Sequence, residues 1–458
     1  MDETARKFVD YAVRLSYADL TPRAIHAVKR SFVDSIGCAI GASRVGPVLA
    51  VHELARQATG THPATIIGTP IRTTPDLAAF VNGVMVRYLD FSDDYFGRSG
   101  IGPHPSDNIS GILAAAESAG SDGKMLVLGI ALAYEACGQL VDNTRLRPSD
   151  GWDHPIFHSI ATALGAGKVL GLSQEQMHHA LGLAVVPNIC LYQTRRGELS
   201  NWKGCAGPNG SRNGLFAVQL AKAGISGPAE PFEGKAGYKR QLNDAFELGA
   251  FGGRDVPYKI ENTFFKPLPL RYSVQLLVWA ALELRDKVSV QNIKSMCVYT
   301  ESRSITTPKL HPEHWDPRTR ETADHSAPYL IAEALLRGSI TAQSFTPEHF
   351  RDPAVLALMQ RIRLEEDAAY TAAYPGTLNC RLEVTLDSGD VVTLHQVNPK
   401  GHPANPMSDQ EIEDKFLRQV DALMPKPQSR ALLDRLWTLE ALDSIEKLFP
   451  LTQVSCSN

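Results

Sequence analysis

Residues 160–171, IATALGAGKVLG, decide the architecture of this chain. Apolar side chains recur along the stretch at helical spacing, and small Ala and Gly residues lie among them. The same composition returns in 111–120, GILAAAESAG, and in 214–224, GLFAVQLAKAG. Because faces of small residues let two helices approach closely, the three stretches predict a compact and mostly buried helical core.

Signals for helix starts extend this interpretation over roughly the first 270 residues. A Thr-Pro pair, which is typical of an N-cap followed by the first helical position, precedes the apolar runs at 22–40 and 77–88. Ser173 and Gln176 form a capping box before a third run at 178–185. We therefore predict successive helices throughout this part of the chain.

The pattern changes after residue 268, where strands are expected. Residues 290–301 have strand-like content, and apolar residues alternate along 380–386. The turn Asp-Ser-Gly-Asp at 387–390 then returns the chain into 391–397. The last two strands are therefore predicted to form a hairpin.

Helices are expected between and after these strands. Two helical stretches are predicted at 322–336 and 354–364. A capping box of Ser408 with Glu411 starts a further helical segment, which continues to Leu448. The region after residue 268 is therefore an α+β unit followed by helices that can pack back on the first part.

The length of 458 residues favours two domains, or three. We predict a mainly α fold with a large helical domain at 1–267, completed by 405–458, and a smaller α+β domain at 268–404. Hydrophobic residues make up 43% and charged residues 21%, as in ordinary globular proteins. The formal net charge of −4 argues against nucleic acid or an anionic membrane as the main partner.

Targeting and redox signals favour a soluble cytoplasmic protein. The N-terminus, MDETARKFVDYAV, resembles neither a signal peptide nor a transit peptide. The richest apolar run, 125–137, is short for a membrane span and contains Glu135. Seven scattered cysteines, the last of them Cys456, form no C-x-x-C pair and predict reduced thiols.

The first polar cluster, LDFSDDY at 89–95, leads on to GPHPS at 102–106. It contains Asp90, Asp94 and His104 between glycines and prolines, where a helix has ended. Two interpretations are open from spacing alone. The acids are either N-caps in a solvated loop, or they serve acid–base chemistry together with the histidine.

The second cluster, GWDHPIFH at 151–158, places His154 and His158 four residues apart. On one helix they would share a face, as in some zinc sites. Pro155 is expected to start the helix, however, and no third ligand follows at a recognisable spacing, so no metal site is predicted. A neutral His154 at a helix N-terminus is better suited to meet an anionic ligand.

The third cluster runs from Thr194 to Gly204. Arg195 and Arg196 are interpreted as an exposed basic turn. Lys203 differs, because it lies in the apolar context WKGCA and a partly buried lysine needs an anion or a function. The remaining histidine pairs are expected at the surface, namely His178 with His179 and His311 with His314.

The last two clusters lie at and beyond the junction of the two regions. In KPLPLRY, prolines hold an extended backbone from which Lys266 and Arg271 can project as two cations. In TRETADHS, Asp324 is either a helix N-cap or a functional acid. His325 beside it is either a satisfied core residue or part of the site.

Several common catalytic motifs are absent from the sequence. It has no G-x-G-x-x-G, no Walker A loop, no G-x-S-x-G and no H-E-x-x-H. These absences count against NAD-dependent hydride transfer, ATP chemistry, serine hydrolysis and zinc proteolysis.

Taken in order, these clusters resemble the MmgE/PrpD family, which includes 2-methylcitrate dehydratases and cis-aconitate decarboxylases. The likeness extends from about residue 4 to 420 and is carried by the following segments: VNGVMVRYLDFSDDY, GPHPSDN, GWDHPIFHSIATALGAGKVLGLS, NWKGCAGPNGSRNG, GPAEPFEG, KPLP, TRETADHSAPYLIAEALL and KGHPANPMSDQEIEDKF. The resemblance implies a large helical domain with a smaller lid-like α+β domain, a homodimer, no metal or organic cofactor, and an active site between the domains.

The resemblance also implies roles for residues at the matching motif positions. The implied catalytic residues are Asp90, His104, His154 and Lys203, and the implied substrate-binding residues are Asp94, Lys266, Arg271, His325 and Tyr329. Two positions depart from the family pattern. Asp94 stands where the family often has Thr, and Arg271 stands near a position where many members have His.

Such a site suits the dehydration of a small hydroxy-polycarboxylate such as 2-methylcitrate. A base must remove a proton α to a carboxylate, an acid must protonate the departing hydroxyl, and cations must stabilise the developing charge. His104 and His154 are candidates for base and acid in either order. Decarboxylation or isomerisation of a similar acid on the same scaffold is one alternative, and a non-catalytic helical binding protein is another.

Overall fold

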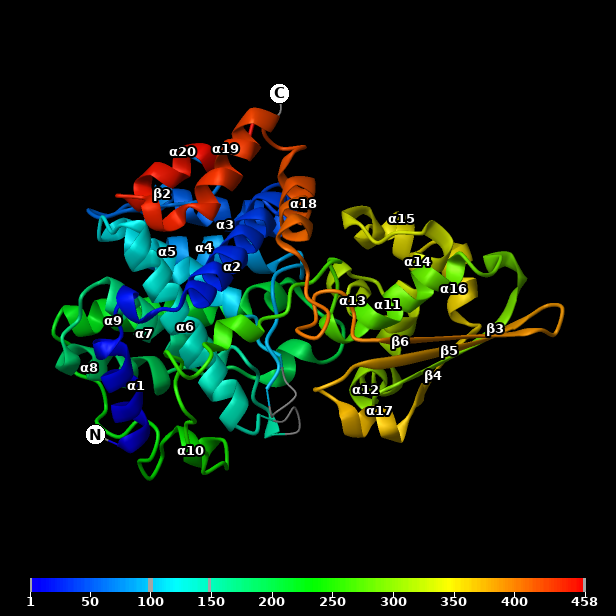
Figure 1. The fold of residues 1–458 in the computed structure, drawn as a ribbon, viewed down its shortest axis with the longest axis horizontal. Helices are drawn as coiled ribbons and strands as arrows, with labels where there is room; N and C mark the ends of the chain where they lie inside the picture. Colours follow the sequence, from blue (N-terminus) through cyan, green and yellow to red (C-terminus); the bar gives the residue numbers. More distant parts are fainter. Residues whose placement is uncertain (1, 98–101, 147–149, 456–458) are drawn as a thin grey trace.

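The computed structural model describes residues 2–97, 102–146 and 150–455, and it contains two hydrophobic cores. The first core runs from Ala5 to Phe265 and resumes from Met407 to Phe449. The second runs from Phe264 to Leu394. Helices build the first region, while the second carries a sheet, and the two lie side by side along the long axis (Figure 1). The predicted fold class, mainly α with a smaller α+β part, is confirmed.

The first region consists of packed helices and one two-stranded antiparallel sheet. Its elements are α1 (Glu3–Arg14), α2 (Pro22–Gly41), α3 (Gly46–Arg56), β1 (Ala64–Thr65), β2 (Arg72–Thr73), α4 (Pro75–Arg87), α5 (Ile109–Ser118), α6 (Gly123–Asn143), α7 (Ile156–Val169), α8 (Gln174–Val185), α9 (Ala206–Lys222), α10 (Tyr238–Gln241), α18 (Asp409–Val420), α19 (Lys426–Trp437) and α20 (Phe449–Thr452). The predicted capping boxes at Ser173 and Ser408 are present. The C-terminal helical segment is divided into shorter helices, whereas one run to Leu448 was expected.

Small residues hold the central helices together, as the opening stretch predicts. A Cβ atom added at Gly165 of α7 would lie 2.6 Å from the carbonyl oxygen of Gly129 in α6. A Cβ atom at Gly214 of α9 would lie 2.4 Å from the carbonyl oxygen of Ser159 in α7. Real side chains never approach so closely, so glycine is required at both helix contacts.

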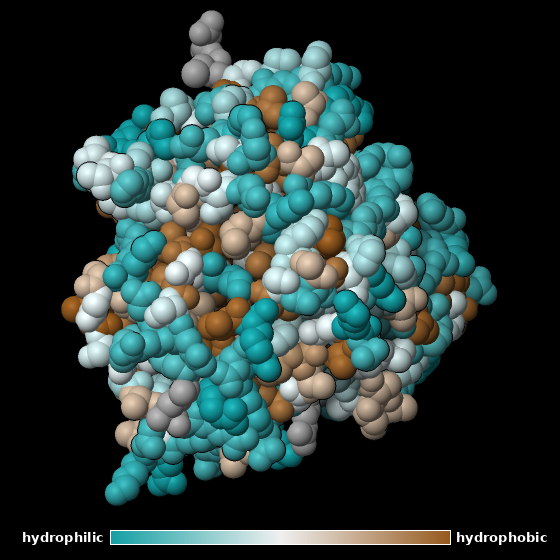
Figure 2. Space-filling model, turned by 60° about the vertical axis from the view of Figure 1, so that its left-hand side comes forward, coloured by the Kyte–Doolittle hydropathy of each residue, from teal (hydrophilic) through white to brown (hydrophobic). Residues whose placement is uncertain are grey.

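The apolar run at 125–137 was expected to be too short to span a membrane, but it belongs to the longer helix α6. It has 21 residues and is long and apolar enough to cross a membrane by length and composition alone. However, 89% of its most apolar window is buried inside the protein, as in the core helix of a globular domain. On the face in Figure 2, hydrophilic side chains surround separate small apolar groups.

The cysteines form no disulfide within the described residues. Six of them are free thiols, and four of these six are buried. Burial raises the pKa of the Cys38 thiol to about 12, with a smaller contribution from Asp34. A buried thiol of this kind behaves as a small apolar side chain. Cys456 lies outside the described residues.

The second region has a four-stranded mixed sheet with the order β4-β3-β5-β6. Strand β3 pairs parallel with β4 and antiparallel with β5, and β5 and β6 form the predicted hairpin. The elements are α11 (Tyr272–Arg285), β3 (Ile293–Thr300), α12 (Ser302–Leu310), α13 (Arg320–Ala323), α14 (Ala327–Arg337), α15 (Pro347–Phe350), α16 (Pro353–Met359), β4 (Ile362–Glu366), α17 (Ala368–Ala373), β5 (Asn379–Leu386) and β6 (Val391–Val397).

Two predicted helices of this region differ from the structure. The helix expected at 354–364 ends at Met359, and the chain continues into β4, which pairs with β3. The helix expected at 322–336 is interrupted after α13, and the side chain of Ser326 caps α14 by accepting the Tyr329 N–H. The interruption places Asp324 and His325 on a turn, and this turn carries part of the site.

The chain passes between the two cores at two adjacent places. Asp94 and Phe264 form an isolated antiparallel bridge, and the Phe265 N–H donates to the carbonyl oxygen of Gly401 at 3.2 Å. Gly401 has φ +90, and a Cβ there would lie 1.8 Å from the Phe265 carbonyl oxygen, so this crossing requires glycine. The exact domain boundaries near residues 267 and 404 stay a prediction.

Candidate active site

A cavity of about 750 Å³, its open mouth included, lies between the two cores. The residues that line it are Arg87, Asp90, Asp94, Phe96, Gly102, His104, Asp153, His154, Tyr192, Arg195, Leu199, Lys266, Arg271, Tyr272, Ser273, Arg303, Thr307, His314, His325 and Tyr374. Seven of the nine predicted site residues are among them, and Lys203 and Tyr329 are not.

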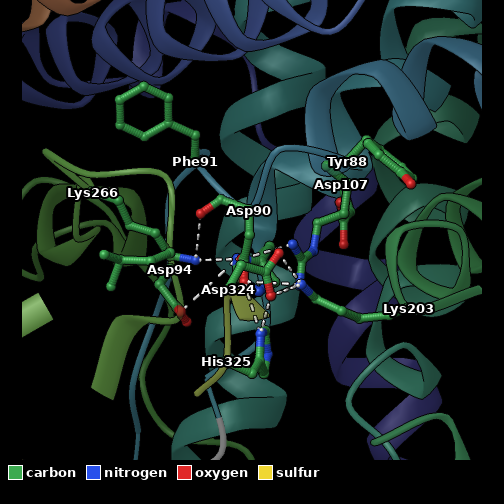
Figure 3. A network of polar contacts seen from close by, with 12 residues as sticks. Tyr88, Asp90, Phe91, Asp94, Asp107, Lys203, Lys266, Asp324 and His325 are labelled. Atoms are coloured by element: carbon green, nitrogen blue, oxygen red, sulfur yellow. Dashed lines mark hydrogen bonds and ion pairs between the residues drawn. The ribbon is translucent and has the colours of Figure 1, made fainter. Parts of the chain in front are cut away.

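Asp90 lies at the centre of a buried charge network (Figure 3). It follows α4 in a left-handed conformation with φ 52, which costs a residue with a side chain about 1–3 kcal/mol. Its Oδ1 atom accepts from Lys266 Nζ at 2.6 Å and from Arg87 Nη1 at 2.8 Å. Burial opposes ionisation, but Lys266, Lys203 and Arg87 together hold the pKa of Asp90 well below its usual range.

Lys203 joins Asp90 to a second carboxylate, Asp324. Its Nζ atom donates to both oxygens of Asp324 at 2.7 Å and lies 3.4 Å from Asp90 Oδ2. Lys203 is 2% exposed. The anionic partner expected for a buried lysine is therefore the pair of buried aspartates, Asp90 and Asp324. Lys203 therefore organises the site from behind the cavity wall.

Asp324 and His325 belong to the site. Asp324 is not an N-cap: it follows α13, and Ser326 caps the next helix. His325 Nδ1 lies 2.5 Å from Asp324 Oδ1 and 3.6 Å from Asp90 Oδ2. Burial and the charge of Lys203 lower the pKa of His325 to about 3, so its imidazole is neutral at pH 7.

His104 and His154 face each other across the large-region wall of the cavity, with ring centroids 5.7 Å apart. His104 Nδ1 lies 2.6 Å from the carbonyl oxygen of Asp93, which can only accept, so this nitrogen carries the hydrogen. Burial, with Arg87 and Lys266, holds the pKa of His104 well below its usual range. His104 is thus a neutral imidazole, and no described residue donates a hydrogen bond to its Nε2 atom, which can accept a proton.

His154 has the opposite tautomer. Arg195 Nη2 donates to His154 Nε2 at 3.1 Å, which leaves the hydrogen on Nδ1. Burial and the charge of Arg195 hold the pKa of His154 well below its usual range. Because the guanidinium occupies its lone pair, His154 is less suited than His104 to accept a proton.

Asp94 is a protonated carboxyl group in this setting. It is 3% exposed, its Oδ1 atom accepts the Tyr95 N–H at 3.0 Å, and its Oδ2 atom lies 3.9 Å from His104 Nδ1. Burial raises the pKa of Asp94 to about 8 although Lys266 opposes the shift. At pH 7 this side chain therefore has a proton to donate.

Three expectations from the sequence are wrong. Arg195 is not an exposed turn residue: its side chain is 11% exposed, lines the cavity and pairs with Asp153 at 3.1 Å. His314 is 2% exposed and also lines the cavity. Tyr329 is buried in the second core, where its hydroxyl donates to the carbonyl oxygen of Ser344. Long-range packing, which leaves little local signal, decides all three.

Three further residues of the predicted polar clusters, His154, His158 and Arg196, can be placed relative to the cavity. Helix α7 begins at Ile156 after Pro155, so His154 precedes the helix as expected. His158, one turn into α7, is buried beside Asp107 at 3.5 Å and does not line the cavity. Arg196 is half-buried and donates to His311 Nε2 at 3.0 Å.

One group of side chains lies close enough together to hold a metal ion, but neighbouring lysines already pair with its carboxylates. Ligand atoms of Asp90, Asp324 and His325 lie within 4.8 Å of one another. Lys203 and Lys266 already neutralise these carboxylates through short ion pairs. A divalent cation there would face two ammonium groups, so the residues present do not suit a metal.

Sequence reasoning missed several residues of the site, including four that are charged or can form hydrogen bonds through their side chains. Arg87 stands in the apolar run VMVRYLD, and a charge in such a run was a usable signal of a buried ion pair. Asp153 precedes the histidine of the second cluster and binds Arg195. Arg303 and Tyr374 stand outside every motif, and only the fold brings them to the cavity.

The cavity between the two cores is lined by ionisable side chains of both regions, as expected for a small-molecule site. The MmgE/PrpD N-terminal domain matches residues 6–249 and the MmgE/PrpD C-terminal domain matches residues 269–439. The chain belongs to the MmgE/PrpD family, as the sequence motifs predicted.

Similar proteins in this family have two kinds of names. The chain is 27% identical to the mitochondrial 2-methylcitrate dehydratase of Yarrowia lipolytica, over 90% of this chain and 82% of that protein. It is 26% identical to the 2-methylcitrate dehydratase of Escherichia coli (strain K12), over 93% and 92%. It is 25% identical to the cis-aconitate decarboxylase of Homo sapiens, over 95% and 91%.

Proposed function

We propose that this protein is a lyase that dehydrates a small hydroxy-polycarboxylate, 2-methylcitrate or a close relative, without a metal or organic cofactor. One observation carries the proposal: a neutral imidazole with a free Nε2 and a protonated carboxyl group line the same cavity, beside a network of buried cations. These groups are His104, Asp94 and the cations around Asp90.

In the proposed reaction, His104 Nε2 removes the proton α to a substrate carboxylate. The electron pair of that C–H bond forms the new double bond, and the hydroxyl group leaves from the adjacent carbon. Asp94 donates its proton to the departing oxygen, so water is released. This assignment separates base from acid, which the two-histidine hypothesis left open, because burial holds both imidazoles neutral.

The cation network is proposed to stabilise the charge that develops on the substrate carboxylate. Four cations surround two carboxylates: Arg87, Lys203, Lys266 and Arg320 against Asp90 and Asp324. The excess is positive, and Lys266 presents it to the cavity. Fixed charges in a site shielded from water stabilise developing negative charge without reorganisation.

The alternatives on the same scaffold are decarboxylation, as in the human relative's name, and isomerisation or epimerisation. Decarboxylation needs the cations and one proton donor, whereas dehydration needs both a base and an acid. The additional carboxyl group of Asp94, where the family often has Thr, favours dehydration. A non-catalytic scaffold does not account for the buried, strained and highly charged arrangement around Asp90.

The test is an NMR time course of chelator-treated protein with 2-methylcitrate, citrate, isocitrate, cis-aconitate and iminodisuccinate. We expect an alkene product from a hydroxy acid without release of carbon dioxide. An itaconate-like product from cis-aconitate would instead assign the decarboxylase activity. No turnover of any of these acids would contradict the proposed substrate class.

We also propose that the protein forms a homodimer in the cytoplasm. The dimer follows from the family resemblance, and light scattering after size-exclusion chromatography tests it. A monomer at micromolar concentration would overturn it. Free thiols among the described cysteines support a reducing compartment, whereas the Yarrowia lipolytica relative is named as mitochondrial. Fractionation of the source cells tests this assignment.

A further inference from the structure

Two arginines of the second region face the cavity without a carboxylate partner. Arg271 precedes α11 and Arg303 lies in the first turn of α12, and both line the cavity. Arg271 donates one hydrogen bond, to Thr307 Oγ1 at 3.1 Å. Among the described residues, neither guanidinium has a carboxylate oxygen within 4.0 Å, and Arg303 makes no hydrogen bond. The cavity thus has two unneutralised cations on one side.

Arg195 is a cavity arginine that does have a carboxylate partner. It pairs with the buried carboxylate of Asp153 and donates to His154. Glu301 is the acid next to Arg303 in sequence, and it is used elsewhere: its carboxylate caps α12 by accepting the backbone N–H and the hydroxyl of Ser304. In the described part of the chain no carboxylate oxygen lies within 4.0 Å of the other two arginines, although the charge of Glu301 acts on Arg271 from farther away.

The two guanidinium groups also repel each other. Burial lowers the pKa of Arg271, and the charge of Arg303 acts in the same direction, while Tyr192 and Glu301 oppose the shift. Two like charges in a partly buried cavity destabilise the free protein unless an anion enters between them. Guanidinium groups have several N–H donors in a planar fork, and a carboxylate matches that geometry with two oxygens.

We propose that Arg271 and Arg303 form a second carboxylate-binding subsite, which selects substrates with a third carboxylate over the corresponding dicarboxylates. The inference rests on the proposed function, because it assigns the substrate's reacting end to His104 and Asp94. Its remaining carboxylate then lies between the two arginines. Since guanidinium stays charged at every accessible pH, this selectivity persists across the pH range of the enzyme.

Binding of two matched ligands tests the subsite without turnover. Propane-1,2,3-tricarboxylate and glutarate have the same five-carbon chain and differ by the central carboxylate. Calorimetry on the full-length protein is expected to show tighter binding of the tricarboxylate. In Arg303→Gln its affinity should fall by about 10- to 100-fold, the effect of losing a charged hydrogen-bond pair, while glutarate affinity changes little.

Arg303 is the better variant because its side chain has no internal hydrogen bond to lose. The melting temperature of ligand-free Arg303→Gln should equal or exceed that of the parent, since a repulsion is removed. A residue with a structural role would instead lower it. Arg303→Lys keeps the charge and should recover part of the affinity. Arg363→Gln, an exposed change on β4 of the same region, is the matched control and should alter neither property.

The outcomes separate the subsite from the proposed function. Equal tricarboxylate affinity in the parent and Arg303→Gln overturns the subsite and leaves the lyase proposal standing. If both acids bind the parent equally well and Arg303→Gln weakens neither, the subsite is overturned, whereas tricarboxylate binding that depends on Arg303 without turnover of any acid leaves the subsite standing and contradicts the lyase proposal. If neither acid binds, both proposals are overturned.

Discussion

Asp90 and the arginines Arg271 and Arg303 line the same cavity but differ in how their charges are paired. Around Asp90, buried cations and carboxylates form ion pairs at distances of 2.6–3.4 Å. Around Arg271 and Arg303, the cations have no carboxylate among the described residues. The ion pairs of the first arrangement form before any ligand binds, while the second obtains a carboxylate partner only from a ligand. Variants in the first arrangement should therefore affect folding and chemistry, whereas variants in the second should affect ligand choice.

The largest effect is expected at the lysine that joins the two aspartates. Lys203→Met leaves Asp90 and Asp324 short of a buried counter-charge and should cost about 3–5 kcal/mol of unfolding free energy, together with most activity. Urea unfolding measures the loss. The exposed Lys235→Met is the control. A Lys203 variant as stable as the parent would show that the network is not structurally complete as described.

The second effect concerns chemistry rather than stability. His104→Ala removes the proposed base and should lower kcat by about 10²- to 10⁴-fold, because general base catalysis contributes in that range. The measurement is the initial rate of alkene formation from the substrate identified by NMR. His62→Ala, on an exposed loop, serves as the control. Retention of full turnover by His104→Ala would eliminate the proposed base.

The third effect is a pH dependence from Asp94. Its pKa is raised to about 8, so the folded protein binds a proton that the unfolded chain releases near pH 4. The Asp94 contribution to stability is therefore greatest at low pH and declines as pH rises toward 8. As the proposed acid, Asp94 also predicts that activity falls by about tenfold per pH unit above its pKa.

Asp94→Asn keeps the shape but cannot transfer the proton. Its melting temperature should lose the decline that the parent shows between pH 5 and pH 8, and its activity should be low at every pH. Thermal scans and rate profiles over that range are the measurements. A parent profile that stays flat well above pH 8, with an active Asp94→Asn, would remove Asp94 from the mechanism.

The smallest effect tests the relocation of Tyr329. Tyr329→Phe loses one buried hydrogen bond to the Ser344 carbonyl and should cost about 1 kcal/mol of stability. Substrate KM should not change, because the side chain lies in the second core and not at the cavity. An increase in KM with unchanged stability would restore Tyr329 to the substrate-binding residues.

The site was predictable where a motif marks a local event. The ends of helices at Thr21, Ser173 and Ser408 follow from side chains that bond to their own turn, so the sequence contains the whole cause. Seven of the nine predicted site residues line the cavity, because each stands beside such an interruption of regular structure. Their chemical roles remain predictions that the variants above examine.

The site was not predictable where partners are distant in sequence. Arg195 and Asp153 are 42 residues apart, and nothing near either one shows that they pair. Arg303 stands in a helix without any catalytic motif. The apolar run at 354–364 could be helix or strand, and β4 forms at its end because β3 offers a parallel neighbour.

The sequence by itself determined the mainly helical fold with its second α+β part, the family, and the small set of residues from which a site could be built. Only the tertiary structure decided the charge state and partner of each of those residues. Helix ends and glycine contacts arise from short-range geometry, which neighbouring residues encode. Burial and ion pairing depend on atoms that are far apart in sequence, 121 residues for Lys203–Asp324 and 381 residues for Lys415–Asp34, and these contacts exist only in the folded protein.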